Sequence, residues 1–338
     1  MNTELALRAP IALVPVLLFL AALLQCDSYK LLRLRTVLAI VAAGALAAGA
    51  GYLVNNQAYA SFAGSFEAYS RYVSPWIEEL LKAVCLMFLI RTRRVGLAVD
   101  AGIAGFALGT GFALVENLYY LASRPDTVLA VQVIRGFGTA IMHGGTATVF
   151  AMISVTLYER RPSGGPQLLL PGLLAAVALH TAFNALLVRP AIATLAILLA
   201  LPLVIYLVFQ RSERNLRQWL DADLDANVRL LEQIQSGAFL DTPGGRYLES
   251  LRDRFHGEVL ADMLCYLRLH GELALRAKGI LLMHESGLEE PPIDAETHAQ
   301  LVEIAALERA IGRTGRLALR PLVLATGKDL WQLTLLGR

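Results

Sequence analysis

The feature that most constrains this chain is a series of apolar segments, each long enough to cross a lipid bilayer. A spanning helix needs about 20 mostly apolar residues, and about seven segments meet that length, at residues 10–26, 36–54, 73–90, 96–121, 137–158, 167–188 and 190–210. Residues 127–136 are expected to lead into the fifth span as an interfacial helix or as its extension. Because backbone polar groups in lipid must bond within their own segment, we expect helices. The sequence predicts an all-α, polytopic bundle.

The charged residues divide the chain into two expected domains. The whole chain is 56% hydrophobic and only 17% charged, which is unusual for a soluble protein. Residues 1–210 hold 14 Lys/Arg and 9 Asp/Glu, whereas residues 211–338 hold 16 and 19. We therefore expect a membrane domain at 1–210 and a small helical domain of unknown role at 211–338. The net charge of +2 comes with no basic stripe interleaved with aromatic residues, so no nucleic-acid partner is expected.

The basic residues between the expected spans predict the orientation of the chain. Clusters alternate with single arginines: Lys30, Arg33 and Arg35, then Arg71, then Arg91, Arg93 and Arg94, then Arg124, then Arg160 and Arg161, then Arg189, then Arg211, Arg214 and Arg217. Loops rich in Lys and Arg stay in the cytoplasm. This predicts an N-terminus outside and a cytoplasmic C-terminal domain.

Polar residues of four expected spans fall in one layer of the membrane. With this orientation and a rise of about 1.5 Å per residue, they lie roughly 5 to 15 Å below the outer surface. They are Glu78, Glu79, Glu116, His143, His180 and Asn184. Ionisable groups at such depth are costly and usually mark a site or a pathway. Taken one at a time, each residue also has a purely structural explanation. It could be a solvated interfacial Glu, part of a Glu78–Lys82 ion pair, or a residue that forms hydrogen bonds between helices.

This set of residues is suited to the hydrolysis of a peptide bond by an activated water. Adjacent carboxylates in a site of low dielectric resist joint ionisation, so that Glu78 or Glu79 can act as a base. His180 and Asn184, one turn apart on one helical face, can supply donors to an oxyanion. No GxSxG stretch points to a serine nucleophile, and Cys85 has no His placed near it in sequence.

Three other functions use the same residues. Glu78, Glu116, His143 and His180 are of ligand types that hold zinc, although no HExxH motif occurs. A proton-coupled transporter uses intramembrane Glu and His as a relay, but we find no inverted repeat to support it. A scaffold that only binds a partner's helix needs no pair of carboxylates to activate water. We expect hydrolysis, with no cofactor required, and zinc as the alternative.

Four short motifs in these spans resemble those of the PrsW family of intramembrane proteases. They are "EELLK" at 78–82, "GFALVENLYY" at 111–120, "RGFGTAIMH" at 135–143 and "HTAFN" at 180–184. The resemblance covers roughly residues 70–190. That family is related to the CAAX prenyl endopeptidases and their bacterial relatives. The chain differs from these relatives at Glu116, where they have His, and at Ala83, where they have Arg.

The resemblance implies roles for the residues and a class of substrate. Glu78 would activate the water, and His180 with Asn184 would stabilise the oxyanion. Glu116 would assist water activation or bind a metal, and His143 would supply the imidazole that the related enzymes have elsewhere. The substrate would be a single-pass membrane protein of the anti-sigma-factor kind, cut near the outer face of the bacterial inner membrane.

Overall fold

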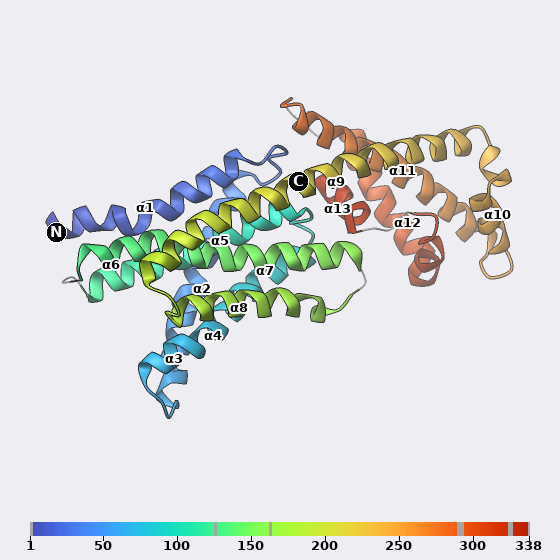
Figure 1. Ribbon diagram of the computed structural model, residues 1–338. Coiled ribbons are helices and arrows are strands. Elements are labelled where there is room, and N and C mark those ends of the chain that lie inside the picture. Colours follow the sequence, from blue (N-terminus) through green and yellow to red (C-terminus); the bar gives the residue numbers. More distant parts are fainter. Residues whose placement is uncertain (1–2, 125–126, 162–163, 289–293, 324–326, 337–338) are drawn as a thin grey trace. The chain divides into compact units, whose positions relative to one another are not determined.

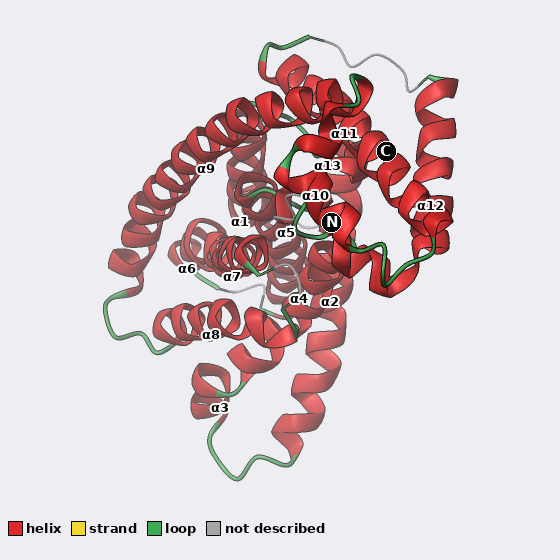
Figure 2. Ribbon diagram, turned by 90° about the vertical axis from the view of Figure 1, so that its right-hand side faces the viewer, coloured by secondary structure: helices red, strands yellow, loops and turns green. Residues whose placement is uncertain are grey.

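The structure is a computed structural model that describes residues 3–124, 127–161, 164–288, 294–323 and 327–336. All regular elements in these ranges are helices (Figures 1 and 2), which confirms the predicted all-α class. The chain divides into two compact units, Met1–Ser212 and Glu213–Arg338. Helix α9, Pro190–Gln235, contributes residues to both.

The N-terminal unit contains eight α-helices that lie wholly within it, together with the first part of α9. They are α1 (Thr3–Gln25), α2 (Leu34–Ala60), α3 (Phe66–Tyr72), α4 (Ser74–Arg91), α5 (Ala98–Ser123), α6 (Leu129–Ile134), α7 (Ala140–Arg160) and α8 (Leu170–Asn184). The π-helix η1 (Arg135–Thr139) joins α6 to α7, and the 3-10 helix η2 (Pro166–Leu169) precedes α8.

Six of the described helical segments are long and apolar enough to cross a membrane. They are Arg8–Gln25, Leu34–Ala60, Ala98–Ser123, Leu129–Arg160, Pro166–Asn184 and Pro190–Gln235. The segment predicted as a span at 73–90 does form a helix, α4, of 18 residues. Glu78, Glu79, Lys82 and Arg91 give α4 too many charges to be counted with the other six. A helical membrane protein is confirmed.

The fifth expected span, 137–158, is extended at its N-terminal end by a further helix. This agrees with the prediction that residues 127–136 lead into the span. Helix α6, η1 and α7 follow one another without a break from Leu129 to Arg160. The π-helical turn consists of "RGFGT", and such turns often occur at functional sites. A Cβ atom at Gly136 would lie 2.1 Å from the carbonyl oxygen of Ile11, so glycine allows α1 to pack directly on this turn.

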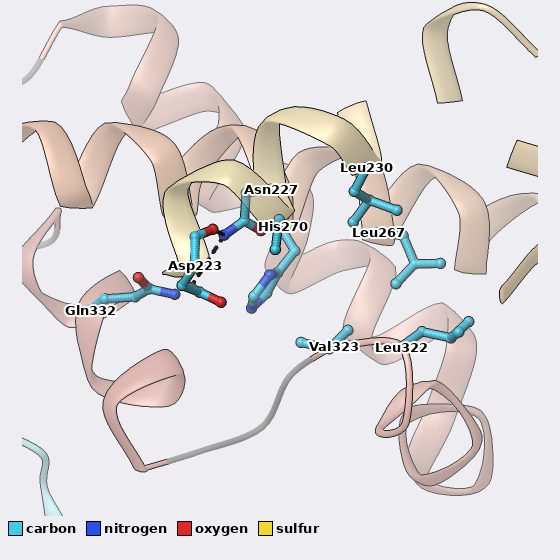
Figure 3. A pocket seen from close by; sticks show the side chains of 9 residues that line it. Asp223, Asn227, Leu230, Leu267, His270, Leu322, Val323 and Gln332 are labelled. Atoms are coloured by element: carbon cyan, nitrogen blue, oxygen red, sulfur yellow. Dashed lines mark hydrogen bonds between the residues drawn. The ribbon is translucent and has the colours of Figure 1, made fainter. Parts of the chain in front are cut away.

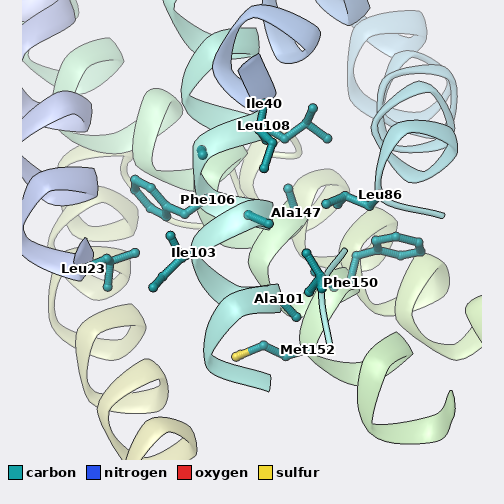
Figure 4. Close-up of a cluster of buried hydrophobic side chains, with 14 of the residues drawn as sticks. Leu23, Ile40, Leu86, Ala101, Ile103, Phe106, Leu108, Ala147, Phe150 and Met152 are labelled. Carbon is teal, nitrogen blue, oxygen red and sulfur yellow. The ribbon is translucent and has the colours of Figure 1, made fainter. Parts of the chain in front are cut away.

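Helix α5 lies at the centre of the N-terminal unit, buried along most of its length. Its ridge of small residues packs on α7: a Cβ at Gly105 would lie 2.5 Å from the carbonyl oxygen of Ala147, and one at Gly109 would lie 2.2 Å from that of His143. Small residues allow such close helix contacts in membranes. Phe106 and Leu108 belong to the apolar cluster around this crossing (Figure 4). The packing of α5 therefore fixes the backbone at His143.

The C-terminal unit contains the end of α9 and five further helices. They are the 3-10 helix η3 (Ala238–Asp241), α10 (Pro243–Ser250), α11 (Gly257–Glu285), α12 (Ala295–Leu319) and α13 (Gly327–Leu335). One face of α11 is buried at Met263 and Leu267, with Leu260 and Leu264 partly buried beside them.

A buried ion pair joins α9 to α11 within the C-terminal unit. Lys278 Nζ donates to Asp223 Oδ2 and also lies 5.2 Å from the centre of the Trp219 ring. Both charged side chains are almost wholly buried. His270, two turns before Lys278 on α11, is buried beside this pair. Burial, with the Lys278 ammonium as a lesser cause, lowers the pKa of His270 to about 4.

The low pKa of His270 predicts that acid destabilises the C-terminal unit. An unfolded His has a pKa of about 6.5, so the unfolded chain takes up the proton first as the pH falls. The contribution of His270 to stability is complete above about pH 6.5 and is lost as the pH falls toward 4. Between pH 7.5 and 5 we expect a loss of about 2 kcal/mol in the free energy of unfolding.

The measurement is a urea titration of the full-length chain in detergent. In the Trp76→Phe background, tryptophan fluorescence comes from Trp219 and Trp331 of the C-terminal unit. His270→Gln should remove most of the pH dependence, whereas His298→Gln, at an exposed position, should keep it. An equal pH dependence in the two variants would contradict the account.

Candidate active site

The first turns of α4 hold Glu78 near the mouth of a cavity. Helix α4 starts with Ser74 and Pro75, and a proline is compatible with this first turn because its missing N–H has no helical partner there. Ser74 Oγ donates to Glu78 Oε1 at 2.5 Å, and Asn55 Nδ2 of α2 lies 3.4 Å from the same oxygen. The second oxygen, Oε2, faces His180 Nε2 at 3.9 Å.

The carboxylate of Glu79 is the most enclosed group of the site. Its Oε1 accepts hydrogen bonds from three helices: Lys82 Nζ of α4 at 2.6 Å, Thr146 Oγ1 of α7 at 3.0 Å and His180 Nδ1 of α8 at 2.8 Å. Glu79 is 2% exposed and Lys82 1%. A buried carboxylate is tolerated when it is paired and fully hydrogen-bonded. Glu79 therefore joins three helices rather than facing the cavity.

The contact with Glu79 sets the protonation pattern of His180. An ionised carboxylate only accepts hydrogen bonds, so Nδ1 of His180 carries the proton. In a neutral imidazole Nε2 then has a lone pair, and this lone pair faces Glu78. His180 can thus accept a proton or bind a cation at Nε2. It can donate to an oxyanion from Nε2 only when it is protonated, which refines the role expected from the sequence.

Glu116 and His143 form a second carboxylate–imidazole pair. His143 Nε2 lies 2.6 Å from Glu116 Oε2, and a terminal guanidinium nitrogen of Arg135 forms an ion pair with Glu116 Oε1 at 3.1 Å. Arg135 is the first residue of the π-helical turn, and its guanidinium lies 3.6 Å from the centre of the Tyr120 ring. These contacts hold the side chains of α5 and α7 together at the same level as Glu78.

Lys82 lies between the two carboxylate–imidazole pairs. Its Nζ lies 3.4 Å from His143 Nδ1 as well as 2.6 Å from Glu79 Oε1. An ammonium group only donates, so His143 Nδ1 accepts and His143 Nε2 donates to Glu116. The rings of His143 and His180 meet edge to face, with their centres 4.9 Å apart. The four spans that the sequence predicted to share a polar layer do bring these side chains together.

Asn184 lines the same cavity but bonds away from the other predicted residues. Its Nδ2 donates to the carbonyl oxygen of Ser70 in α3 at 3.2 Å. Asn184 is the last residue of α8, one turn after His180. The bond to Ser70 uses one of the two N–H groups of the amide, and the second remains available to a substrate.

The cavity has a volume of about 900 Å³, large enough for a peptide segment. Glu78, Glu116, His143 and His180 line it together with Asn184. Its remaining wall carries several aromatic side chains, from α2, α3 and α5: Tyr52, Tyr59, Phe66, Tyr69, Tyr119 and Tyr120. The lining thus combines aromatic side chains with many polar and charged groups.

Three of these residues could also hold a metal ion. Glu78, His143 and His180 each offer one ligand atom, and these atoms lie within 4.8 Å of one another. One carboxylate and two imidazoles match the protein ligands of many catalytic zinc sites. The His180 Nδ1–H to Glu79 bond is the kind of contact that orients a zinc-bound histidine. The donor set fits zinc, with Glu116 next to His143.

Some partners in the site were not among the predicted residues. Thr146 donates to Glu79 from α7, and its position one turn after His143 would have suggested it. Asn55 and Ser74 orient Glu78, but short polar residues near a helix end are too common in sequences to indicate this. Nothing in the sequence pairs Arg135 with Glu116, and only the structure brings them together.

Removal of the Lys82 charge is expected to destabilise the N-terminal unit. Lys82→Met leaves the Glu79 carboxylate buried without its ammonium partner, a change that typically costs about 3–5 kcal/mol. The double variant Glu79→Gln/Lys82→Met removes both charges and should recover most of this loss. Thermal unfolding in detergent measures both. Equal stability of Lys82→Met and the wild type would contradict the pairing.

A comparison with protein-family models agrees with this geometry. Residues 33–209, more than half of the chain, match the family described as "PrsW family intramembrane metalloprotease". The matched range contains every residue of the site described above. No curated protein and no solved structure matches the chain. The protein therefore belongs to the PrsW family of intramembrane proteases.

Proposed function

We propose that this protein hydrolyses a peptide bond of a membrane-anchored protein with a water molecule activated by Glu78. The observation that carries the proposal is the position of Glu78 Oε2, which faces His180 Nε2 at 3.9 Å in the wall of the cavity. The gap between these two acceptors suits a water that donates one proton to each. Membership of a family of intramembrane proteases supports the class of reaction.

In this proposal Glu78 carries out both proton transfers, one to each side of the tetrahedral intermediate. Glu78 takes a proton from the water as its oxygen attacks the carbonyl carbon, which becomes a tetrahedral oxyanion. When the C–N bond breaks, Glu78 returns the proton to the leaving amine. The oxyanion needs donors, and Asn184 Nδ2 is the candidate that needs no added proton, since His180 Nε2 accepts from the water in this step. Glu79 holds His180 in place through Nδ1 and does not meet the substrate.

The second pair supports the first from across the cavity. Glu116 stays paired with Arg135 and His143, so its charge is balanced by neighbours on η1 and α7. His143 packs against His180 and Phe112. We propose that the Glu116–His143 pair holds the His180 ring in its position and thereby helps to position the water.

A zinc-dependent form of the same reaction is the second candidate. The cluster of Glu78, His143 and His180 favours it, as does the word metalloprotease in the family's description. When bound, zinc would lower the pKa of a water and polarise the substrate carbonyl. Both nitrogens of His143 already meet Glu116 and Lys82, so binding by His143 would have to displace one of them.

The proposed substrate is a single-pass membrane protein of the anti-sigma-factor kind. With the N-terminus outside and the C-terminal unit in the cytoplasm of a bacterial cell, the cavity lies in the outer half of the inner membrane. The alternation of basic loops supports this orientation. It requires α4 to cross the membrane despite its charges, and the partners of Glu79 and Lys82 make this possible.

Loss of the Glu78 carboxylate is expected to abolish cleavage. Gln has the shape of Glu but cannot accept the proton of water, so Glu78→Gln should lower the rate at least about 100-fold. The readout is the appearance of substrate fragments, found by proteomics of membranes from cells that express each variant at equal levels. Glu159→Gln, at the far end of α7, is the matched control. Identical fragments in Glu78→Gln and wild-type cells would exclude this mechanism and favour a transporter.

Treatment with a chelator separates the two forms of the mechanism. We expect the purified protein to keep its cleavage rate after dialysis against EDTA and 1,10-phenanthroline, because Glu78 and His180 already supply the groups that accept protons from water. Bound metal is measured on the same samples by mass spectrometry. A rate that falls with the zinc content and returns on addition of zinc would show instead that the zinc-dependent form is correct.

A further inference from the structure

The C-terminal unit contains a second, smaller cavity, unrelated to the proposed hydrolysis. It has a volume of about 210 Å³ and is lined by residues of α9, α11 and α13 and by Leu322 and Val323 after α12 (Figure 3). Its polar lining consists of Asp223, Asn227, His270 and Gln332. Aliphatic side chains, among them Leu230 and Leu267, form the remaining wall. Liquid water at this volume would amount to about seven molecules.

Two buried polar atoms of this cavity have no hydrogen-bond partner among the described residues. They are His270 Nε2 and Gln332 Oε1. His270 is 7% exposed and Gln332 1%. Buried polar atoms are usually hydrogen-bonded, and leaving one without a partner is unfavourable. Both side chains line the cavity, so a molecule in it can supply the missing bonds.

The charges around the cavity favour a neutral molecule. Asp223 is balanced by Lys278, and His270 is neutral near pH 7 because its pKa is lowered to about 4. Asn227 Nδ2 donates to Asp223 Oδ2 at 3.2 Å, and Lys278 donates to the same oxygen. The other oxygen, Oδ1, can still accept a bond. Among the described residues that line the cavity, a molecule with a net charge would meet no unpaired opposite charge.

We propose that this cavity binds a small neutral molecule that carries a primary amide on an apolar body. The two amide N–H groups match the acceptors Gln332 Oε1 and Asp223 Oδ1. The amide oxygen matches the remaining atom, His270 Nε2, in the tautomer that carries its proton there. The apolar body lies against Leu230, Leu267 and their aliphatic neighbours. The site thus equips the C-terminal unit to sense a metabolite of this class.

Benzamide is a suitable probe, with acetophenone and benzoate as comparisons. Acetophenone replaces the amide nitrogen by a methyl group, and benzoate replaces it by a charged oxygen. Saturation-transfer NMR titrations of the full-length chain in lipid nanodiscs measure the affinity of each. We expect benzamide to bind at least about 10-fold more tightly than either analogue, since one lost hydrogen bond in a desolvated site is worth about 1.4 kcal/mol or more.

Variants test whether the binding occurs in this cavity. Gln332→Leu and His270→Phe keep the bulk of the side chains and should each weaken benzamide at least 10-fold. Gln332→Leu should also unfold at an equal or higher temperature without ligand, which shows that the variant folds. His298→Phe, at an exposed position of α12, should bind as the wild type does. Equal affinity for the three probes, equal affinity in all variants, or no binding would overturn the proposal.

Discussion

The site depends on one buried carboxylate, that of Glu79. Its Oε1 is bonded by Lys82, Thr146 and His180 at 2.6 to 3.0 Å, so α4, α7 and α8 meet at a single atom. The charge is tolerated there because Lys82 balances it and Thr146 and His180 add hydrogen bonds to the same oxygen. The two adjacent glutamates consequently differ in role. Glu79 fixes the helices and the orientation of His180, and Glu78 keeps an oxygen toward the cavity.

The close packing of the helices makes this meeting possible. Glycine at 105 and 109 lets the α5 and α7 backbones touch, and glycine at 44 and 111 does the same for α2 and α5. Larger side chains at these positions would separate the helices that carry Glu116 and His143. The π-helical turn before α7 adds a residue to one turn, and Arg135 at its start reaches Glu116. Backbone geometry therefore sets the spacing of the two carboxylate–imidazole pairs.

The sequence predicted the layer of polar residues but not their partners. The depth of a residue in the membrane follows from its position in its helix, because each residue adds about 1.5 Å along the helix axis. This was enough to predict that Glu78, Glu116, His143 and His180 lie close together. The rotation of each helix about its axis is decided by packing between helices. For that reason the pairing of Glu116 with His143 and Arg135, and the bond of Asn184 to Ser70, came only from the structure. In the C-terminal unit the sequence predicted helices, whereas the Asp223–Lys278 pair depends on a contact between α9 and α11, which are far apart in the chain.

The account is tested most directly by the position of the cut in a natural substrate. Mass spectrometry of the new termini locates the scissile bond, and it can be placed along the substrate's membrane span. The catalytic residues lie at those ends of α4, α5, α7 and α8 that are near the loops containing Arg71 and Arg124. We therefore expect the cut within two or three turns of the end of the substrate's span on that side of the membrane. A cut at the middle of the span or at its opposite end would contradict the placement of the catalytic layer.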